Sequence, residues 1–314
     1  MIEVENLTKN YGPFTALKGI SFHIGRGEII GFLGRNGAGK TTTMRILTCF
    51  MPPSSGQAIV AGHDVFFDSL AVRKRVGYLP ENVPLYPEMT VHGYLKYVAK
   101  IKGTPQKELK IRIDYVVNAC GLEDRRHQII GQLSKGFRQR VGLAQSLIHD
   151  PDVIILDEPT SGLDPRQVIE IRELIKELGK DRTIILSTHI LAEVSLTCER
   201  VIIINEGEIA GDIRLSNGGV SSIERDSSTQ TSFNNANVLD LEIQGNAMEI
   251  ESTLAEIPRV DVIDIRDSIY RVSYPADTDS RSEISSTIIA KGWQLLEMRT
   301  VETTIEEVFL RLTT

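Results

Sequence analysis

Hydrophobic residues in the first eighty positions either alternate with polar ones or form short runs that end at glycine-containing turns. Such runs are typical of β-strands bounded by turn residues. A glycine-rich stretch interrupts them once, and apolar residues at helical spacing follow it. The pattern predicts strands at 2–7, 16–24 and 28–33, a helix from about 40 to 49, and strands at 57–61 and 76–79.

Residues 90–148 have a different pattern, because their apolar positions recur at helical spacing and no strand is indicated. Three helices are predicted there, at 90–102, 106–120 and 135–148. Beyond them, short β-branched apolar runs are typical of strands buried on both faces of a sheet. Strands are predicted at 153–156, 183–186, 201–205 and 208–213, with a helix over 165–178. The first 215 residues are therefore predicted to form an α/β core with an all-helical insertion at about 90–150.

A change of composition separates the end of the chain from this domain. Ser, Asn, Gly and Thr dominate residues 216–237, which we interpret as a linker. From 238 to 314 the predicted order is β-α-β-β-α-β followed by a helix, which fits a small ferredoxin-like α+β domain. This accessory domain holds no cluster of Asp, His or Cys, so we expect a regulatory or structural role.

Overall composition narrows the class of protein. With 314 residues, 41% hydrophobic and 25% charged, the chain is expected to form about two soluble domains. A net charge of −7 argues against nucleic acid as a general partner. The three cysteines lie far apart, which disfavours a zinc or redox site. The N-terminus does not resemble a secretion signal, and no apolar run approaches the ~18–20 residues that cross a bilayer. Any membrane span is expected to come from another chain.

The glycine-rich stretch is the first candidate site. Residues 34–42 match G-x-x-x-x-G-K-[ST] between a predicted strand and a predicted helix, the context that a phosphate-binding loop requires. Backbone N–H groups and the helix N-terminus attract phosphate oxygens there, Lys40 adds a full positive charge, and the hydroxyl of Thr41 suits Mg²⁺. The residues expected to hold the nucleotide are Gly34, Asn36, Gly37, Ala38, Gly39, Lys40, Thr41 and Thr42.

Polar residues that follow two buried strands complete a candidate catalytic set. Asp157 suits Mg²⁺ coordination, and Glu158 could orient the attacking water or take its proton, although an acidic helix cap is the alternative interpretation. His189 follows the next strand, and parallel strands end on the same edge, so we expect it beside Glu158. Tyr11, in the first turn, could stack on adenine or pack on the sheet, and its spacing leaves both open.

The heptad Leu-Ser-Lys-Gly-Phe-Arg-Gln at 133–139 resembles the signature motif L-S-x-G-x-x-Q of ABC-type ATPases. The phosphate loop, the heptad, the Asp–Glu pair, Ser-Gly-Leu-Asp at 161–164 and a single strand-end His occur in the order of ABC-transporter nucleotide-binding domains, over about residues 2–215. The resemblance implies an α/β P-loop NTPase core with an antiparallel β subdomain and a helical insertion. It also implies ATP and Mg²⁺ as cofactors.

In that family two subunits face each other head to tail around two nucleotides. Carried over to this chain, Ser134, Gly136 and Gln139 would contact the ATP held by the other subunit, and Asp164 would link the two sites. The partner subunit is therefore expected to be a second copy or a paralogue. By the same resemblance, the adenine-stacking aromatic, the phosphate lysine and the switch histidine are Tyr11, Lys40 and His189.

One position departs from the family pattern. Where the family usually has Gln, at the start of the helical insertion, this chain has Glu81 in the stretch Tyr-Leu-Pro-Glu-Asn at 78–82. A carboxylate can ligate Mg²⁺ but adds negative charge beside ATP, so its role stays open. This stretch and the C-terminal residues 304–310 resemble a branch of bacterial export-type ATPases, including those linked to gliding motility and to copper-enzyme maturation.

The resemblance thus implies the cytoplasmic ATPase subunit of an ABC exporter, bound to the inner face of the membrane through a separate integral permease. The loop at 82–89 is apolar and stiffened by two prolines, and we expect it either to dock the permease or to cap the next helix through Met89 and Thr90. Both can hold. The alternative function is a soluble, non-transport ABC ATPase that acts as a regulator or on a macromolecular complex. A single phosphate loop and a short insertion disfavour that alternative.

Overall fold

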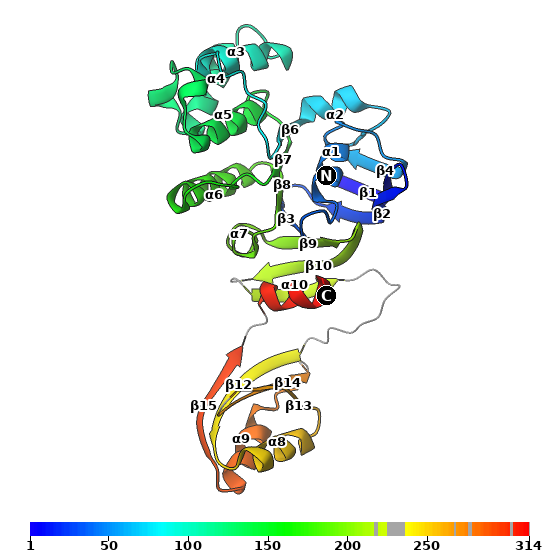
Figure 1. Ribbon diagram of the computed structural model, residues 1–314, viewed down its shortest axis with the longest axis vertical. Helices are drawn as coiled ribbons and strands as arrows, with labels where there is room; N and C mark the ends of the chain where they lie inside the picture. The colour runs from blue at the N-terminus through cyan, green and yellow to red at the C-terminus, as the bar shows by residue number, and fades with distance from the viewer. Residues whose placement is uncertain (217–218, 225–235, 267, 276–277, 302–303, 314) are drawn as a thin grey trace. The chain divides into compact units, whose positions relative to one another are not determined.

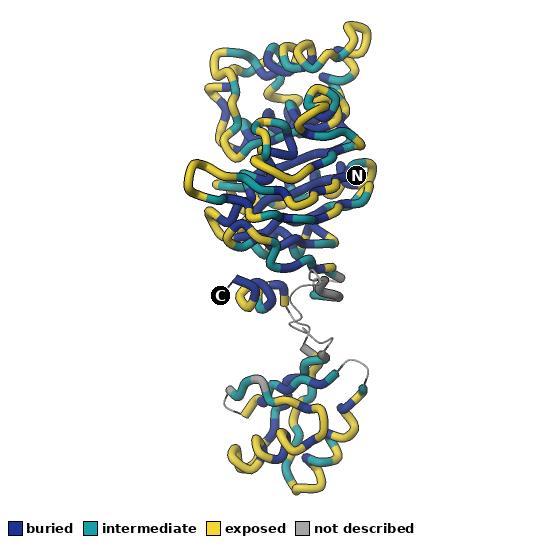
Figure 2. The backbone as a smooth tube through the Cα atoms, turned by 90° about the vertical axis from the view of Figure 1, so that its right-hand side faces the viewer, coloured by how far each residue is buried: buried dark blue, intermediate teal, exposed yellow. Residues whose placement is uncertain are grey.

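The computed structural model describes residues 1–314 except 217–218, 225–235, 267, 276–277, 302–303 and 314. The chain forms two compact units. The first comprises Met1–Leu215 and Phe309–Thr314 and is called here the ATPase unit after the activity that the sequence resemblance predicts for it, and the second, the C-terminal unit, comprises Ser216–Val308. Each unit has its own buried centre (Figure 2).

A small antiparallel sheet covers one side of the ATPase unit, and its strand order is β2-β1-β4-β5. The turn between the first two strands pairs Tyr11 with Phe14 and contains Gly12 at a positive φ of 58°. Alternating apolar residues of β1 and β2 face inward, as the sequence pattern predicts. The strands are β1 (Ile2–Tyr11), β2 (Phe14–Ile24), β4 (Ser55–Val60) and β5 (His63–Asp64).

The larger sheet has the order β11-β10-β9-β3-β8-β7-β6, and the strands from β9 to β6 run parallel. Every residue of β7 and β8 is buried, which confirms the interpretation of their continuous apolar runs. Their carboxyl ends lie at one sheet edge together with that of β3. The strands are β3 (Ile29–Leu33), β6 (Val76–Leu79), β7 (Val153–Asp157), β8 (Thr183–Thr188), β9 (Arg200–Asn205), β10 (Glu208–Ser216) and β11 (Gly219–Glu224).

Helix α1 (Lys40–Leu47) packs in the core between the two sheets, where Met44 and Leu47 are fully buried and Phe22 lies 5.6 Å from Phe32 between ring centroids. The predicted helical insertion is present as α3 to α5 (Figure 1), and α5 packs against β6, where a Cβ on Gly142 would lie 2.7 Å from Leu79 Cδ1. Its first helix is capped by Thr90, whose hydroxyl accepts the Gly93 N–H at 3.1 Å. The remaining helices of this unit are α2 (Ser69–Arg75), α3 (Val91–Ile101), α4 (Leu109–Ala119), α5 (Lys135–Leu147), α6 (Pro165–Gly179) and α7 (Leu191–Thr197), with single turns at Glu123–Arg125 and Ile130–Gln132.

Two short elements, β5 and α2, were not predicted from the sequence, because pieces of two and seven residues carry too little periodicity. A strand, β11, also lies inside 216–237, where the composition predicted a linker. An edge strand can form from backbone pairing without a long apolar run, so a polar composition does not exclude it. The predicted linker residues 217–218 and 225–235 lie outside the described part of the chain.

The C-terminal unit contains one antiparallel sheet in the order β13-β14-β12-β15, covered by α8 and α9. The first and third strands are central, so the predicted β-α-β-β-α-β ferredoxin-like order is confirmed. The sequence placed all of 238–314 in this domain, whereas Phe309–Thr314 group with the ATPase unit. The elements of this sheet and its helices are β12 (Ala236–Gln244), α8 (Ala247–Glu256), β13 (Asp261–Arg266), β14 (Ile269–Pro275), α9 (Arg281–Ala290) and β15 (Gln294–Val301). The last helix, α10 (Ile305–Thr313), begins in the C-terminal unit, and its residues from Phe309 belong to the ATPase unit.

Candidate active site

The glycine-rich loop joins β3 to α1 and wraps around a lysine. Gly39 is the N-cap of α1 at a φ of +115°, and a Cβ there would lie 2.8 Å from the side chain of Leu17, so only glycine fits. The Lys40 ammonium donates to the carbonyls of Gly34 at 2.8 Å and Arg35 at 3.3 Å. The loop therefore holds a cation and the free N–H groups of a helix N-terminus on one concave surface, which suits an anion.

Lys40 is only 6% exposed, and its Nζ lies 3.8 Å from Glu158 Oε1. Burial lowers the pKa of the Lys40 ammonium, and the negative charges of Glu158, Asp157 and Glu81 counteract that shift. The negative charges around Lys40 thus favour the protonated form of its ammonium group. A phosphate group, carrying more charge than a carboxylate, would serve that purpose at closer range.

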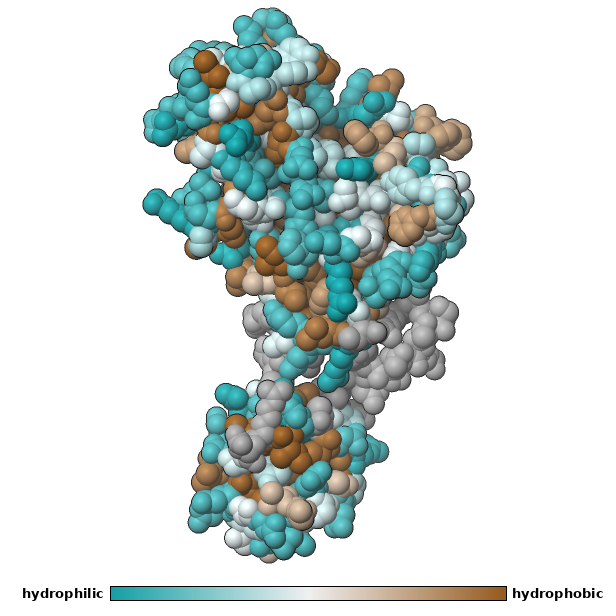
Figure 3. All heavy atoms as spheres, in the orientation of Figure 1, coloured by the Kyte–Doolittle hydropathy of each residue, from teal (hydrophilic) through white to brown (hydrophobic). Residues whose placement is uncertain are grey.

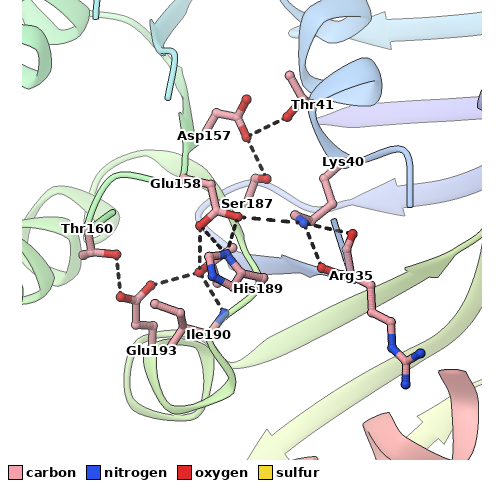
Figure 4. A network of polar contacts seen from close by, with 12 residues as sticks. Arg35, Lys40, Thr41, Asp157, Glu158, Thr160, Ser187, His189, Ile190 and Glu193 are labelled. Carbon is pink, nitrogen blue, oxygen red and sulfur yellow. Dashed lines mark hydrogen bonds and ion pairs between the residues drawn. The ribbon is translucent and has the colours of Figure 1, made fainter. Parts of the chain in front are cut away.

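Asp157 ends β7 with its side chain directed at the glycine-rich loop (Figure 4). Its Oδ1 accepts from Ser187 Oγ at 2.9 Å and from Thr41 Oγ1 at 3.4 Å. Burial raises the pKa of this carboxyl, and the hydrogen bonds from Ser187 and Thr41 oppose the rise. Its Oδ2 is buried and has no hydrogen-bond partner in the described part of the chain. An unpartnered carboxylate oxygen beside a hydroxyl is the donor set that Mg²⁺ prefers.

The described residues hold no group of three His, Cys, Asp or Glu side chains that could bind a metal by themselves. That finding is compatible with a nucleotide-dependent cation, because Mg²⁺ in P-loop enzymes also takes phosphate oxygens as ligands. The residues present therefore fit Mg²⁺ bound together with a nucleotide.

Glu158 follows Asp157 in a left-handed conformation, with φ at +50°, and its N–H donates to the Ser187 carbonyl at 2.9 Å. His189 Nδ1 lies 2.9 Å from both carboxylate oxygens of Glu158. The expected meeting of these two side chains at one sheet edge is therefore present, with Lys40 on the other side of the carboxylate (Figure 4). A non-glycine residue held at positive φ marks a strained position of the kind found at active sites.

Other polar side chains of this network were not among the sequence candidates. Thr188 Oγ1 lies 3.0 Å from Glu193 Oε2 and 3.4 Å from Glu158 Oε2, and Thr160 donates to Glu193 Oε1. Glu193 is buried although it is an acidic residue in the first turn of α7. Helical spacing in the sequence does not connect it with His189, because Glu193 is the third residue of α7 whereas His189 precedes the N-cap of that helix, Ile190. These contacts tie the His189 segment to the loop that follows Glu158.

A cavity of about 480 Å³ opens above the glycine-rich loop. Tyr11, Glu81, Glu158 and His189 line it with the loop. Phe14 and Ala16 also line it and were not predicted, and Ser161 was noted in the sequence only as part of the motif at 161–164. The candidates from the loop itself that line the cavity are Asn36, Gly37, Gly39, Lys40, Thr41 and Thr42. Tyr11 is also held at the sheet, because its hydroxyl donates to Met51 Sδ at 3.1 Å, so both interpretations of this residue are compatible with its position.

The remaining candidates lie outside this cavity. Ser134 and Asp164 are N-caps of α5 and α6, where their side chains accept the N–H groups of Phe137 at 3.4 Å and Gln167 at 2.9 Å. Gly136 and Gln139 are buried in the first turns of α5. None of these four lines the cavity of its own chain, and neither do the candidates Gly34, Ala38 and Asp157.

The glycine-rich loop between β3 and α1, with an Asp–Glu pair and a histidine at neighbouring strand ends, defines a nucleotide hydrolase of the P-loop class. Comparison with known proteins is more specific. The sequence model of the ABC transporter family matches residues 17–161. The chain is 31% identical to the ABC transporter ATP-binding protein YxlF of Bacillus subtilis (strain 168) over 99% of both chains. It therefore belongs to the ABC transporter ATP-binding proteins.

Two further similarities concern function and assembly. The chain is 40% identical to the bacitracin transport ATP-binding protein BcrA of Bacillus licheniformis, over 68% of this chain and 69% of that protein. It matches a dimeric structure of a post-hydrolysis state of the ATP-binding cassette MJ0796, bound to ADP and Pi, with a TM-score of 0.63 and 26% identity. That match covers 69% of this chain and all of the other. This chain is thus the ATP-binding and hydrolysing subunit of an ABC transporter. No helix among the described residues is long and apolar enough to cross a membrane.

Proposed function

We propose that two copies of this chain, or one copy and a paralogue, close head to tail around two Mg²⁺·ATP and so drive an export permease at the inner face of the membrane. The observation that carries the proposal is the position of Glu158, a buried carboxylate between Lys40 and His189 at the cavity wall. A carboxylate held in this way can orient a water molecule toward the terminal phosphate.

Several residues of the cavity, together with Asp157, have a proposed part in the reaction. Lys40 and the N-terminus of α1 bind the β- and γ-phosphates, and Tyr11 contacts the adenine ring. Thr41, Asp157 and Glu81 are the proposed Mg²⁺ ligands, and the ion neutralises phosphate charge when bound. His189 orients Glu158 and approaches the γ-phosphate from the exposed side.

The head-to-tail arrangement is supported by the position of the heptad. Ser134 and Gly136 lie at the N-terminus of α5, outside their own cavity, where free N–H groups can bind the partner's γ-phosphate. Asp164 lies at the start of the neighbouring helix α6. A γ-phosphate that bridges two chains stabilises the closed dimer, and its release after hydrolysis removes the bridge.

A second cavity, of about 370 Å³, supports the proposed contact with the permease. It lies between the end of α1, α2, and helices α3 and α5 of the insertion, and Phe50, Arg73 and Lys102 are among its lining residues. Large hydrophobic residues in α2, in α3 and in the segments beside α1, α2 and α3 are exposed, and Figure 3 shows hydrophobic side chains at the surface of the ATPase unit. They include Phe50, Phe66, Phe67, Leu70, Tyr86, Tyr97 and Ile101.

The loop at 82–89 contributes Tyr86, whose ring packs edge-on against Tyr94 and Tyr97 at centroid distances of 6.0 and 5.7 Å. Since the capping bond of Thr90 is also present, the loop can cap α3 and dock a partner at once. The double change Leu85→Asp and Tyr86→Ser should abolish copurification with the proposed permease and preserve ATP binding. Undiminished copurification would exclude this loop as the docking site.

The central experiment is Glu158→Gln, which keeps the size of the side chain and removes its basicity. The variant should bind ATP, hydrolyse it at least about 100-fold more slowly, and accumulate as an ATP-dependent dimer. Analytical ultracentrifugation with ATP or ADP measures the formation of the dimer. Glu173→Gln, on the exposed face of α6, is a matched control. A Glu158→Gln chain that stays monomeric with saturating ATP would refute the head-to-tail mechanism.

A further inference from the structure

Two glycines, Gly136 in the first turn of α5 and Gly162 in the loop before α6, are each covered by a side chain from the other segment. A Cβ on Gly136 would lie 2.4 Å from Gln167 Oε1 and 2.5 Å from its Nε2, so the carboxamide lies directly on the backbone of Gly136. A Cβ on Gly162 would lie 2.0 Å from Lys135 Nζ. The start of α5 and the start of α6 therefore each contribute one side chain that covers a glycine of the other segment. We call this reciprocal contact the glycine interlock.

Gln167 is held in place at both ends. Its N–H donates to the N-cap Asp164 at 2.9 Å, and its side chain reaches Gly136 at the start of α5. One turn further along both helices, Arg140 of α5 forms an ion pair with Glu170 of α6. The contact between the two helices thus extends beyond the loops and aligns their N-termini.

The two helices belong to different parts of the ATPase unit, since α5 closes the helical insertion and α6 follows the strand that bears Asp157. Both N-termini carry residues that the proposed dimer presents to the partner's nucleotide. If the loops were independent, closure would have to order each of them, at the cost of additional conformational entropy. A contact already formed in the single chain removes that requirement.

We propose that Gln167 is a positioning residue, which holds the heptad loop in register with the Asp164 loop so that both meet the partner's ATP as one surface. The inference rests on the proposed head-to-tail function. The inference also explains in a second way why residue 136 is glycine. Besides allowing close approach of a phosphate, the absence of a Cβ leaves room for the Gln167 side chain.

The test is a double-mutant cycle with Gly136→Ala, Gln167→Ala and the combination, each in the Glu158→Gln chain. Gln167→Ala should leave the affinity of the single chain for a fluorescent ATP analogue unchanged and weaken the ATP-dependent dimer at least tenfold. Gly136→Ala should weaken the ATP-dependent dimer more than Gln167→Ala does, because the new Cβ clashes with the Gln167 carboxamide. The double variant should dimerise at least tenfold more tightly than Gly136→Ala alone, since Gln167→Ala removes that clash. Gln167→Met, of similar length, should retain most of the dimer affinity, and Glu173→Ala on the exposed face of α6 should change nothing.

A second measurement does not depend on dimerisation. Amide hydrogen exchange of residues 134–137 in the nucleotide-free Gln167→Ala chain should be at least tenfold faster than in the parent, and circular dichroism verifies that the variant is folded. Unchanged exchange together with a combined variant no better than Gly136→Ala would overturn the inference. If the Glu158→Gln parent itself fails to dimerise, the proposed function fails, and the exchange experiment alone decides whether Gln167 positions the heptad loop.

Discussion

Leu312 in α10 allows a direct test of where the end of the chain belongs. Phe309–Thr314 group with the ATPase unit although the C-terminal unit precedes them in sequence. Leu312 is 8% exposed, and a Cβ on Gly211 of β10 would lie 2.8 Å from its Cδ1. Gly211 therefore leaves the space that Leu312 fills, and the last helix should contribute to the stability of a unit that begins three hundred residues earlier.

The expected magnitude follows from this burial. Leu312→Ala removes a buried side chain from a site that can relax only in part, which lowers the free energy of unfolding by about 2–4 kcal/mol. For a unit of this size the thermal midpoint should fall by roughly 4–16 °C. Leu310, on the same helix, is 56% exposed. Leu310→Ala should therefore change the free energy of unfolding by less than about 0.5 kcal/mol.

Two probes distinguish the units during urea unfolding. Binding of a fluorescent ATP analogue reports on the ATPase unit, whereas Trp293, the single tryptophan of the chain, packs against the core of the C-terminal unit. Leu312→Ala should move the nucleotide-binding transition to lower urea and leave the Trp293 transition in place. Equal effects of Leu310→Ala and Leu312→Ala, or a shift confined to Trp293, would refute the assignment of this helix to the ATPase unit.

Three further predictions concern the site. Asp157→Asn should stabilise the nucleotide-free chain at neutral pH, because burial raises the pKa of this carboxyl and the folded state therefore loses stability as the pH rises and the group ionises. In thermal melts, the gain in stability over the parent should shrink as the pH is lowered. Calorimetric titration should find that Mg²⁺ no longer strengthens nucleotide binding by the variant. A variant less stable than the parent at neutral pH would contradict this account. His189→Ala should reduce kcat about 100-fold and leave ATP affinity within about twofold, since its ring contacts Glu158 and not the glycine-rich loop. If equilibrium binding showed that ATP affinity falls as much as kcat, the ring would hold the nucleotide instead. Ser134→Ala should preserve ATP binding by the single chain and weaken the ATP-dependent dimer of Glu158→Gln in sedimentation experiments, whereas weaker binding by the monomer would argue for a role within the same chain.

Most of the fold could be predicted from local pattern, and the exceptions have physical causes. Continuous apolar runs identify β7 and β8 because both faces of those strands are covered. The edge strand β11 lacks that constraint, and its polar composition was interpreted as a linker. The glycine-rich loop and the Asp–Glu pair could be predicted because their chemistry depends on residues adjacent in sequence. Glu193 could not, because its partner Thr160 lies 33 residues away and only the fold brings them together.

The heptad and Asp164 show a further limit of single-chain patterns, since the function expected of them needs a second chain. What the structure adds is a contact within one chain, between Gln167 and Gly136, that no motif contains. Such a contact is invisible in sequence because each residue is ordinary for its helix. It is detected only through the absence of space for a Cβ at Gly136.

Several unfavourable features of the ATPase unit converge on the cavity. Glu158 has a strained φ of +50°, Asp157 Oδ2 is buried without a partner among the described residues, and burial lowers the pKa of Lys40. A phosphate would pair with Lys40 and a cation with Asp157, so Mg²⁺·ATP should relieve two of the three. Ligand at 100 times its Kd stabilises a fold by about 2.7 kcal/mol. Because these features all lie in the ATPase unit, nucleotide should shift the unfolding of that unit and leave the Trp293 transition unchanged.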